Sequence, residues 1–218
     1  MKLIHVFSGG MDSTVLLAKW LHEKCDVTCL HFQYGSKHNP KELLAANTIT
    51  EHYNVPLTII DVSTVLKHFK SALLSGGEAI PEGHYADDNM KKTVVPFRNG
   101  IMLAIAAGFA ESNDAEAISL ASHAGDHTIY PDCRPAFNTA MEDAIREGTW
   151  ARVRMLAPFY NMSKTDIATL GYRLKVPFEL TWTCYKGGRK HCGVCGACSE
   201  RKEAFHDSGT PDPTEYEV

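Results

Sequence analysis

The sequence of 218 residues contains no long hydrophobic segment and no excess of basic residues. Its longest apolar run, residues 101–110, is much shorter than the roughly 20 residues that cross a bilayer as a helix. Lys and Arg together number 22 and Asp and Glu 26, so the formal net charge of −4 argues against constitutive nucleic-acid binding. No internal repeat, low-complexity segment or signal peptide is evident, so we expect a cytoplasmic protein that does not enter a membrane.

Two well-known phosphate-binding motifs are also missing. No Gly-x-x-x-x-Gly-Lys-Ser/Thr sequence occurs, which excludes a Walker A loop. No Gly-x-Gly-x-x-Gly occurs either, which excludes the dinucleotide-binding fingerprint. The composition, 44% hydrophobic and 22% charged, is that of an ordinary globular protein, and the length suits one α/β domain with a small appendage.

A glycine-rich segment, residues 8–14, stands between two apolar runs. The run before it, residues 3–7, is typical of a buried strand, and the run after it, residues 15–18, is typical of a helix start. A glycine-rich turn in this place directs backbone N–H groups and a helix N-terminus at one point, which suits a phosphate group. We expect Asp12 or Ser13 to cap the helix.

The sequence Ser-Gly-Gly-Met-Asp-Ser at residues 8–13 resembles the PP-loop of the ATP pyrophosphatases. This resemblance implies a loop that binds the pyrophosphate of ATP while the α-phosphorus is attacked, so that AMP and pyrophosphate leave. The alternative is an ordinary strand–turn–helix corner without a ligand. With Mg²⁺ bridging the phosphates, the residues assigned to ATP are Ser8, Gly9, Gly10, Met11, Asp12, Ser13, Thr14 and Val15, of which Asp12 and Ser13 are also candidate catalytic residues.

Four further strands are indicated by short apolar or β-branched runs, at residues 27–32, 57–61, 117–121 and 153–156. Helix-length segments separate them, as in right-handed βαβ units, which predicts an α/β fold with a doubly wound, parallel, five-stranded sheet. Ligands of such sheets bind at the carboxyl ends of the strands. We therefore expect the glycine-rich loop to share one cleft with Gln33 and Tyr34, which follow the second strand.

Two of the helices carry specific expectations. Residues 101–111 are apolar on nearly all sides, which predicts a helix buried against the sheet. Arg98 and Asn99 precede it, an unusual place for a guanidinium group unless it faces a ligand or a carboxylate. The helix that follows residue 38 is expected to direct its apolar side chains inward, namely Leu43, Leu44 and Ile49.

Four of the seven cysteines lie within residues 184–198, spaced Cys-x7-Cys-x2-Cys-x2-Cys. This spacing suits a metal site in a reducing compartment better than a disulfide framework. Four thiolates complete the tetrahedral shell of a structural zinc ion, so the predicted Zn²⁺ ligands are Cys184, Cys192, Cys195 and Cys198. An iron–sulfur cluster is the alternative, although the ferredoxin pattern needs a further Cys followed by Pro. His191, beside Lys190, is expected to face solvent.

The predicted domain organisation has three parts. Residues 1–176 form the PP-loop domain, residues 177–206 a small zinc-binding helical module, and residues 207–218 a flexible tail. Within the first part, residues 75–93 are rich in glycine and charge, and a loop of this length favours a mobile flap over the cleft.

Several motifs together resemble one family within the PP-loop superfamily, the 7-cyano-7-deazaguanine synthases. The similarity extends from Lys2 to about Phe205. Besides the PP-loop, the matching motifs are Gln33-Tyr34-Gly35 with Lys37-His38 and Glu42-Leu43, Val95-Pro96-x-Arg98-Asn99, Tyr130-Pro131-Asp132-Cys133-Arg134, Thr181-Trp182-x-Cys184-Tyr185 and the cysteine cluster. Ala136 and the pair Gly196-Ala197 depart from the commonest family pattern.

The resemblance implies a C–N bond-forming ligase of queuosine biosynthesis, which is a homodimer. Such an enzyme converts 7-carboxy-7-deazaguanine and ammonia to the nitrile through adenylated intermediates. Arg98 and Asn99 are then candidates for binding the substrate carboxylate or the α-phosphate, Arg98 being also a candidate catalytic residue. Asp132 is a candidate for the guanine-like edge and Arg134 for nearby charge, whereas Cys133 is expected to be packed and not catalytic.

Two other classes of function remain open at this stage. One is a PP-loop enzyme that acts on tRNA, such as a thiolase, which would need a basic surface and a sulfur-carrying cysteine pair. The other is a nucleotide-binding module without catalysis, against which the intact loop argues.

Overall fold

The computed structural model describes residues 1–84 and 87–218, and its centre is a parallel five-stranded sheet. The strands lie in the order β3-β2-β1-β4-β5. Their bounds are β1 Lys2–Val6, β2 Asp26–Gln33, β3 Leu57–Asp61, β4 Ala117–Ser119 and β5 Arg154–Leu156. The predicted sheet is confirmed, and the order reverses at β1, which pairs with β2 on one side and with β4 on the other.

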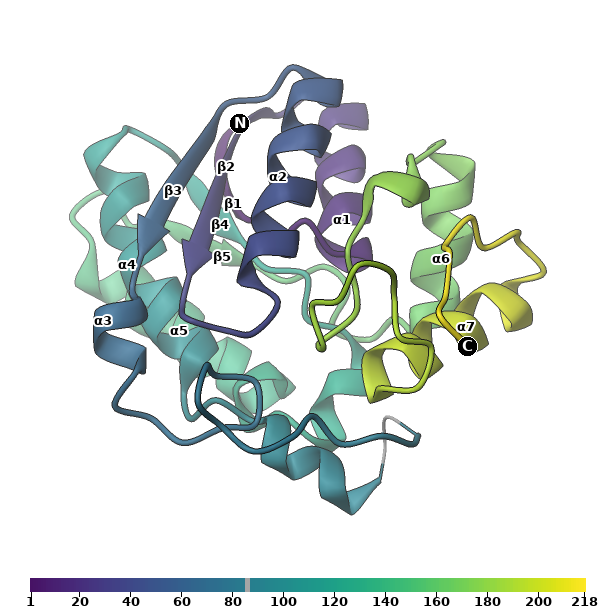
Figure 1. Ribbon diagram of the computed structural model, residues 1–218. Helices are drawn as coiled ribbons and strands as arrows, with labels where there is room; N and C mark the ends of the chain where they lie inside the picture. Colours follow the sequence, from purple (N-terminus) through teal and green to yellow (C-terminus); the bar gives the residue numbers. More distant parts are fainter. Residues whose placement is uncertain (85–86) are drawn as a thin grey trace.

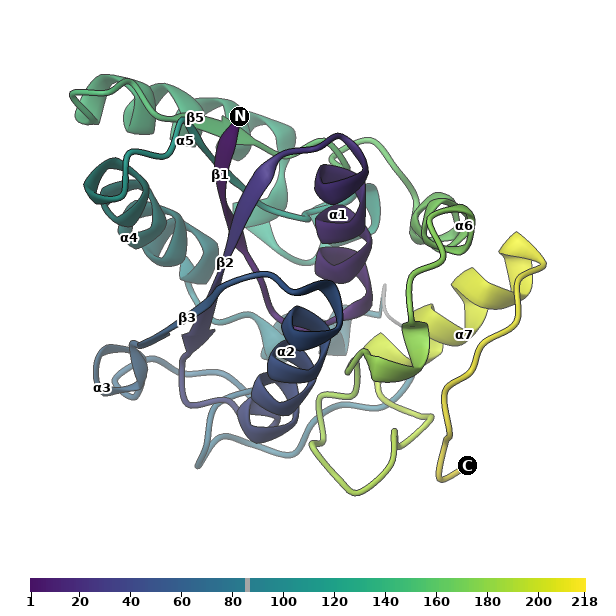
Figure 2. The same ribbon diagram turned by 90° about the horizontal axis from the view of Figure 1, so that it is seen from above.

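Helices cover both faces of the sheet (Figures 1 and 2). On one face lie α1 (Met11–His22), α2 (Asn39–Tyr53) and α6 (Lys164–Arg173), with α7 (Gly196–Ser208) packed outside α6. On the other face lie α4 (Arg98–Ser112) and α5 (Pro135–Gly148), with the short α3 (Ser63–Leu66) near β3. Short 3₁₀ helices lie between these elements: η1 Asp88–Thr93, η2 Ala124–Thr128, η3 Pro131–Cys133 and η4 Phe178–Leu180. In the part of the chain that the structure describes, no helix has the length and apolarity to cross a membrane.

The alternation of side chains along β1 separates two apolar cores. Leu3 packs with the residues of α1 and α6, whereas its neighbour Ile4 packs with those of α4. This follows from the two-residue period of a strand, which sends successive side chains to opposite faces. Helix α4 is buried against the second face, as predicted, with Leu103 and Ala106 completely inaccessible.

Two local expectations are wrong. Leu44 is 61% exposed, because α2 turns Ala45, Ala46 and Ile49 toward the core and Leu44 lies on the opposite side of the helix. The start of α1 has no side-chain cap: Gly10 is the N-cap residue, and the side chain of Asp12 bonds to Lys164 instead. By contrast, α6 starts with a capping box between Ser163 and Asp166, as its sequence indicates.

The chain around the cysteines packs closely on the rest of the protein. Phe178 and Phe205 are buried in the same core as α1, and α6 lies against α7. The tail runs back along the module, where Tyr216 bridges to His191 and Tyr216 Oη donates to Asp212. The domain boundaries and the flexibility of the tail stay predictions.

Part of the predicted flap touches the same module. Glu82 forms a bridge with Cys195, and Gly83 donates its N–H to the carbonyl of Val194 at 3.1 Å. Residues 85–86 of this segment lie outside the described residues, and its mobility stays a prediction.

Candidate functional site

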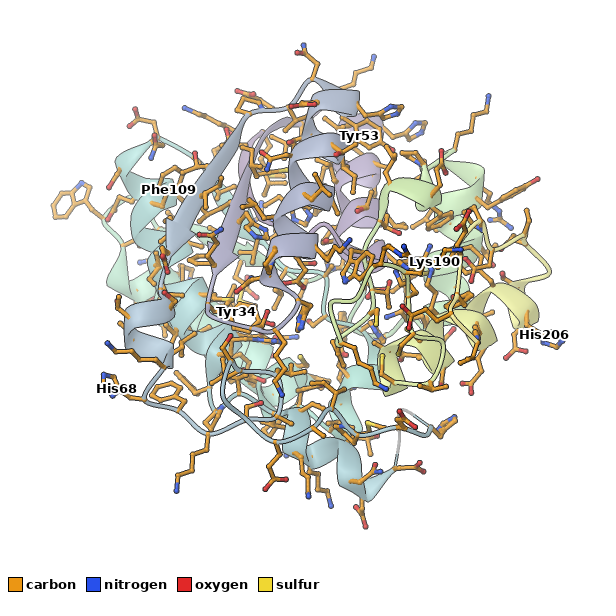
Figure 3. The ribbon with its side chains drawn as sticks, in the orientation of Figure 1. Tyr34, Tyr53, His68, Phe109, Lys190 and His206 are labelled. Carbon is orange, nitrogen blue, oxygen red and sulfur yellow. The ribbon has the colours of Figure 1, made fainter. Side chains whose placement is uncertain are left out.

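A cavity of about 220 Å³ lies at the carboxyl edge of the sheet, where the PP-loop follows β1. Ser8 from the loop and Tyr34, which follows β2, both line it, so the predicted shared cleft is confirmed for Tyr34, whereas Gln33 does not line the cavity. Figure 3 shows Tyr34 at this end of the sheet, whereas Tyr53 lies near the far end of α2.

The PP-loop is held tightly against α2. Gly9 has φ +78°, and a Cβ atom at this position would lie 2.7 Å from the backbone nitrogen of Ala46 and 2.8 Å from the carbonyl oxygen of Glu42. Only glycine fits both the left-handed conformation and this space. On the other side, Trp182 donates its backbone N–H to the carbonyl of Gly9 at 3.0 Å.

The eight residues predicted to bind ATP divide into two groups. Five of them line the cavity: Ser8, Gly10, Met11, Asp12 and Ser13. The other three do not: Gly9 packs on α2, Thr14 is fully buried with its hydroxyl donating to the Gly10 carbonyl at 2.7 Å, and Val15 is part of the core.

A buried histidine on β1, His5, binds the loop through a backbone carbonyl. His5 on β1 is inaccessible, and burial lowers its pKa to about 4, so the ring is neutral near pH 7. Its Nε2 lies 2.8 Å from the carbonyl oxygen of Ser13, which makes Nε2–H the donor. Nδ1 then accepts from Ser119 Oγ at 2.8 Å, and that oxygen accepts in turn from Trp20 Nε1 at 3.1 Å. Sequence reasoning missed His5, because an inward-facing histidine in a strand resembles any other core residue.

A cluster of charged side chains lies beside the loop. Lys164 Nζ, from the start of α6, lies 2.8 Å from Asp12 Oδ2 and 3.0 Å from Glu200 Oε2. Burial would raise the pKa of Asp12, but the charge and the hydrogen bond of Lys164, with further contributions from neighbouring groups, hold that pKa below its usual value. Burial would likewise lower the pKa of Lys164, but Asp12 and Glu200 raise it, so the pair is ionised.

His123 and Asp126, from the loop after β4, extend this cluster. His123 Nε2 lies 3.9 Å from Asp12 Oδ2 and 3.6 Å from Asp126 Oδ1. Sequence reasoning missed Lys164, His123 and Asp126 as site residues. Each follows a strand at its carboxyl end, and that rule, applied to β4 and β5 as it was to β1 and β2, would have found them.

Arg98 enters the cavity from the start of α4. Its Nη1 donates to Tyr34 Oη at 3.3 Å, and its guanidinium carbon lies 5.3 Å from the centre of the Tyr34 ring. Among the described residues no carboxylate lies within ion-pair distance of Arg98. Its charge is therefore free to meet a ligand.

A largely buried acid, Glu42, lies on the α2 side of the same cavity, with 15% of its side chain exposed. Burial raises the pKa of Glu42 to about 7, although the charge of Arg98 opposes the shift. Glu42 Oε1 lies 3.6 Å from His38 Nε2, and Tyr34 Oη lies 3.1 Å from the same nitrogen. His38 lies within hydrogen-bond distance of the carbonyl of Tyr185 through Nδ1, and burial, with the charge of Arg98, lowers its pKa to about 4. The neutral His38 ring thus connects Tyr34 with Tyr185 of the cysteine-bearing module.

The structure brings only two of the four predicted substrate residues to the cavity, Arg98 and Asn99. Asp132 is buried beneath them, where its Oδ2 accepts the backbone N–H of Asn99 at 2.8 Å and so satisfies a free donor at the start of α4. Arg134 is exposed and donates to the carbonyl of His127 at 3.1 Å. Neither side chain lines the cavity.

Cys133 lines the cavity but does not have the properties of a nucleophile. Burial raises its pKa far above the usual range, and Asn99 Nδ2 lies 3.1 Å from its sulfur. A thiol in this state is neutral and inert, in agreement with its omission from the catalytic residues.

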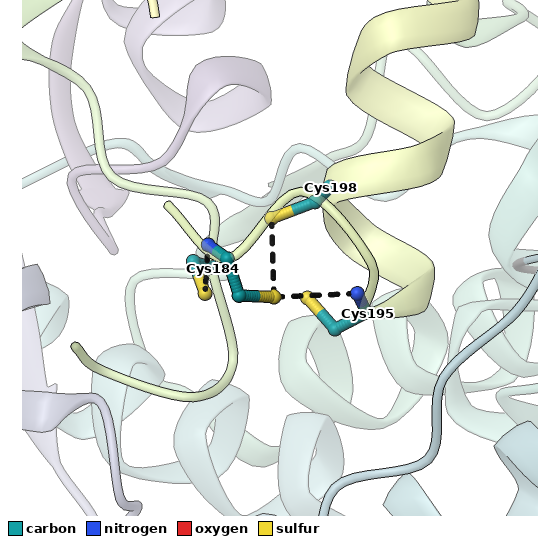
Figure 4. A group of neighbouring side chains, drawn as sticks. Cys184, Cys195 and Cys198 are labelled. Atoms are coloured by element: carbon teal, nitrogen blue, oxygen red, sulfur yellow. Dashed lines mark hydrogen bonds between the residues drawn. The ribbon is translucent and has the colours of Figure 1, made fainter. Parts of the chain in front are cut away.

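The four clustered cysteines form a candidate metal centre (Figure 4). All are buried, and their sulfur atoms lie within 4.8 Å of one another. Zinc–sulfur bonds of about 2.3 Å place tetrahedral ligands about 3.8 Å apart, so a small contraction of this group would enclose the ion. Backbone N–H groups already point at sulfur: Cys192 donates to Cys184 Sγ and Cys195 to Cys192 Sγ, both at 3.3 Å. All seven cysteines are present as free thiols.

The prediction that His191 faces solvent is wrong. The residue is only 7% exposed, and its ring centre lies 4.3 Å from that of Trp182. Its Nε2 accepts the N–H of Thr183 at 3.0 Å, while Glu217 in the tail donates to its carbonyl at 2.8 Å. The returning tail covers this side of the module, which no local pattern around Lys190 indicates.

Comparison with known proteins places this chain in a family. In curated sequences, a 7-cyano-7-deazaguanine synthase from Desulfotalea psychrophila is 54% identical over 215 residues, covering 99% of this chain and 98% of the relative. One from Porphyromonas gingivalis is 52% identical over 213 residues, covering 97% and 96%. One from Rhizobium rhizogenes is 49% identical over 220 residues, covering 100% and 92%.

Solved structures share the fold at low identity. A U34-tRNA thiolase from Methanococcus maripaludis, solved with its [4Fe-4S] cluster, superposes with a TM-score of 0.54 at 12% identity, over 96% of this chain and 65% of the other. An NMN synthetase from Francisella tularensis superposes with a TM-score of 0.53 at 13% identity, over 96% and 77%. Likeness at this level concerns the fold alone, so it does not favour the tRNA-directed alternative. A family model described as queuosine biosynthesis protein QueC matches residues 2–209, and the chain belongs to that family.

Proposed function

We propose that the protein is a 7-cyano-7-deazaguanine synthase, which joins 7-carboxy-7-deazaguanine and ammonia and releases AMP and pyrophosphate from ATP. The observation that carries the proposal is the combination, in one cavity, of the PP-loop with Arg98, which has no carboxylate within ion-pair distance in the described part of the chain. The loop suits the phosphates of ATP and Arg98 suits a substrate carboxylate. The names of the close relatives support the same activity.

The chemistry proceeds in two adenylation steps. A carboxylate oxygen attacks the α-phosphorus of ATP, the bond from that phosphorus to pyrophosphate breaks, and an acyl-adenylate forms. Ammonia adds to the acyl carbon, a proton leaves the nitrogen, and departure of AMP gives the amide. The amide oxygen then attacks a second ATP in the same way. Loss of the remaining N–H protons and departure of AMP leave the nitrile, so each product molecule consumes two ATP.

These steps need positioning and charge stabilisation more than a protein nucleophile. The loop residues that line the cavity would hold the phosphates, and Lys164, paired with Asp12, supplies the positive charge that the loop sequence lacks. Asp12 would hold Mg²⁺, which neutralises phosphate charge when bound. Arg98 would hold the substrate carboxylate near the α-phosphorus. Asp132, which accepts the backbone N–H of Asn99 at the start of α4, is better suited to supporting Arg98 and Asn99 than to contacting the base.

We also propose that the cysteine centre holds Zn²⁺ in a structural role. Four buried sulfur ligands leave no open position for substrate or water. The homodimer and the cytoplasmic location stay predictions from the family resemblance and the sequence.

An isotope experiment tests the reaction directly. The substrate, labelled with ¹⁸O at both carboxylate oxygens, is incubated with ATP, Mg²⁺ and ammonium, and the nucleotide products are examined by mass spectrometry. The mechanism expects one heavy oxygen in each AMP formed, because each adenylation transfers one substrate oxygen to phosphorus. Unlabelled substrate in ¹⁸O water is the control and should give unlabelled AMP. Formation of ADP, or AMP without label, would overturn the proposed reaction.

A further inference from the structure

Each of the two chain segments that supply the cysteines is linked to the PP-loop, one directly and the other through Lys164. Trp182, two residues before Cys184, donates its backbone N–H to the carbonyl of Gly9 at 3.0 Å. Glu200, two residues after Cys198, reaches the loop through Lys164: its Oε2 lies 3.0 Å from Lys164 Nζ, which lies 2.8 Å from Asp12 Oδ2. Trp182 and Glu200, each two residues from a cysteine of the metal centre, thus connect that centre to the phosphate site by two separate routes.

A buried arginine joins these two segments. Arg201, the neighbour of Glu200 on α7, is completely inaccessible. Its Nη1 donates to Thr181 Oγ1 at 2.7 Å and to Thr183 Oγ1 at 3.0 Å, on either side of Trp182. Trp182 Nε1 in turn donates to the carbonyl of Cys184 at 2.8 Å. Trp182 and Glu200 therefore belong to the same packed unit as the cysteines.

The segment that carries Cys184 and Cys192 has little structure of its own. Between η4 and α7, residues 181–195 contain no helix and no strand, apart from isolated bridges. A metal ion held by four sulfurs from positions 184 to 198 would therefore add a second cross-link between this segment and α7, beside the hydrogen bonds of Arg201. Binding free energy at such a site is also folding free energy of the segments it joins.

We propose that metal at the cysteine centre and ATP at the PP-loop bind cooperatively, with Glu200 and Trp182 as the positioning residues that transmit the effect. The inference rests on the proposed binding of ATP at the loop. With metal bound, Glu200 holds the Lys164 ammonium between itself and Asp12, and Trp182 holds the Gly9 carbonyl. Without metal, both contacts loosen, although no cysteine touches the nucleotide. Coupling is reciprocal, so ATP also retards loss of the metal.

The test measures binding and not turnover. The dissociation constant of α,β-methylene ATP with Mg²⁺ is determined for Zn²⁺-loaded and chelator-treated full-length protein. Release of Zn²⁺ to a chromogenic chelator is followed with and without the same analogue. We expect metal loading to tighten analogue binding about tenfold, within the usual range for coupled sites, and the analogue to slow metal release correspondingly.

Matched variants on α7 identify the path of the coupling. Glu200→Gln keeps the size of the side chain but removes the charge that holds Lys164, and should reduce the coupling to about threefold or less. Glu203→Gln lies on the same helix, where Glu203 is 49% exposed and pairs with His84, and should leave the coupling unchanged. If chelation weakens analogue binding only because it unfolds the protein, Glu200→Gln and Glu203→Gln will show the same change in analogue affinity on metal loading. That result would contradict the proposal.

The outcomes separate this inference from the assigned function. The coupling would be overturned if the analogue bound equally well with and without metal and did not change the rate of metal release. The synthase assignment would then remain intact. Failure of the analogue to bind Zn²⁺-loaded protein at all would overturn both the ATP site and the coupling.

Discussion

The ammonium nitrogen of Lys164 lies 2.8 Å from a carboxylate oxygen of Asp12, although 152 residues separate them in the sequence. The PP-loop has no lysine of its own, unlike a Walker A loop. Helix α6 therefore supplies the cation that the loop lacks, and Asp12 holds it beside the cavity.

Replacement of Lys164 should reduce the rate of catalysis far more than it reduces the stability of the fold. For Lys164→Met we expect AMP formation to fall about 100-fold or more, the usual cost of removing a preorganised charge from a phosphate site. Lys164→Arg should retain part of the activity, because the charge remains. Lys19→Met, on the exposed side of α1 where Lys19 pairs with Glu23, is the control and should keep full activity. Normal turnover by Lys164→Met would contradict the role assigned to this residue.

Arg98 should govern affinity for the carboxylate substrate. Arg98→Gln removes the cavity guanidinium, so the KM for 7-carboxy-7-deazaguanine should rise at least tenfold, about 1.4 kcal/mol, while the KM for ATP changes little. Arg134→Gln should alter neither constant, because Arg134 is exposed and outside the cavity. Steady-state kinetics with each substrate varied in turn makes the distinction, and a larger effect from Arg134 would restore its place as a substrate residue.

Gly9 and Gly108 provide a matched pair of glycine substitutions. Gly9→Ala places a Cβ atom 2.7 Å from the Ala46 nitrogen in a left-handed conformation, which should cost about 2 kcal/mol or more of stability and displace the loop. Gly108→Ala meets no atom within 4 Å in the interior of α4 and should stabilise the protein by about 0.5–1 kcal/mol. Denaturant unfolding measures both, and unchanged stability of Gly9→Ala would contradict the close packing on α2.

The buried carboxyl of Glu42 should make stability depend on pH. Its pKa is raised to about 7 in the folded protein from 4.5, so the folded state binds this proton more tightly. The stabilisation is fully present below pH 4.5 and is lost as pH rises through 7. Glu42→Gln should therefore be more stable than the wild type at pH 8, by up to about 3 kcal/mol, but not at pH 5. Glu51→Gln, exposed on the same helix, should show no such difference between the two pH values.

Metal analysis should find one zinc ion per chain at the cysteine centre. Cys195→Ser should lose the metal and yield aggregated or protease-sensitive protein, because thiolate–zinc binding is coupled to local folding. Cys25→Ser, which lies outside the cluster, should keep the metal. Mass spectrometry of the metals decides the matter, and iron with labile sulfide in place of zinc would favour the iron–sulfur alternative.

Local patterns predicted the parts of this protein that depend on neighbouring residues in the chain. The five strands, the loop after the first of them and the spacing of the cysteines could all be found in this way, because strand periodicity, glycine turns and ligand spacing are short-range properties. The rule that ligands bind at the carboxyl ends of parallel strands then placed the PP-loop and Tyr34 in one cavity.

The tertiary structure decided which side chains complete the site. Asp132 and Arg134 adjoin Cys133 in the sequence, yet Asp132 binds the start of α4 and Arg134 faces solvent. Glu42 and Glu200, to which the sequence analysis assigned no role, line the cavity from α2 and α7. A charge can be buried only where a partner or ligand meets it, and that partner comes from another element of the fold. Burial and the approach of distant helices therefore determine the role of each ionisable group here, and neither is a property of the local sequence.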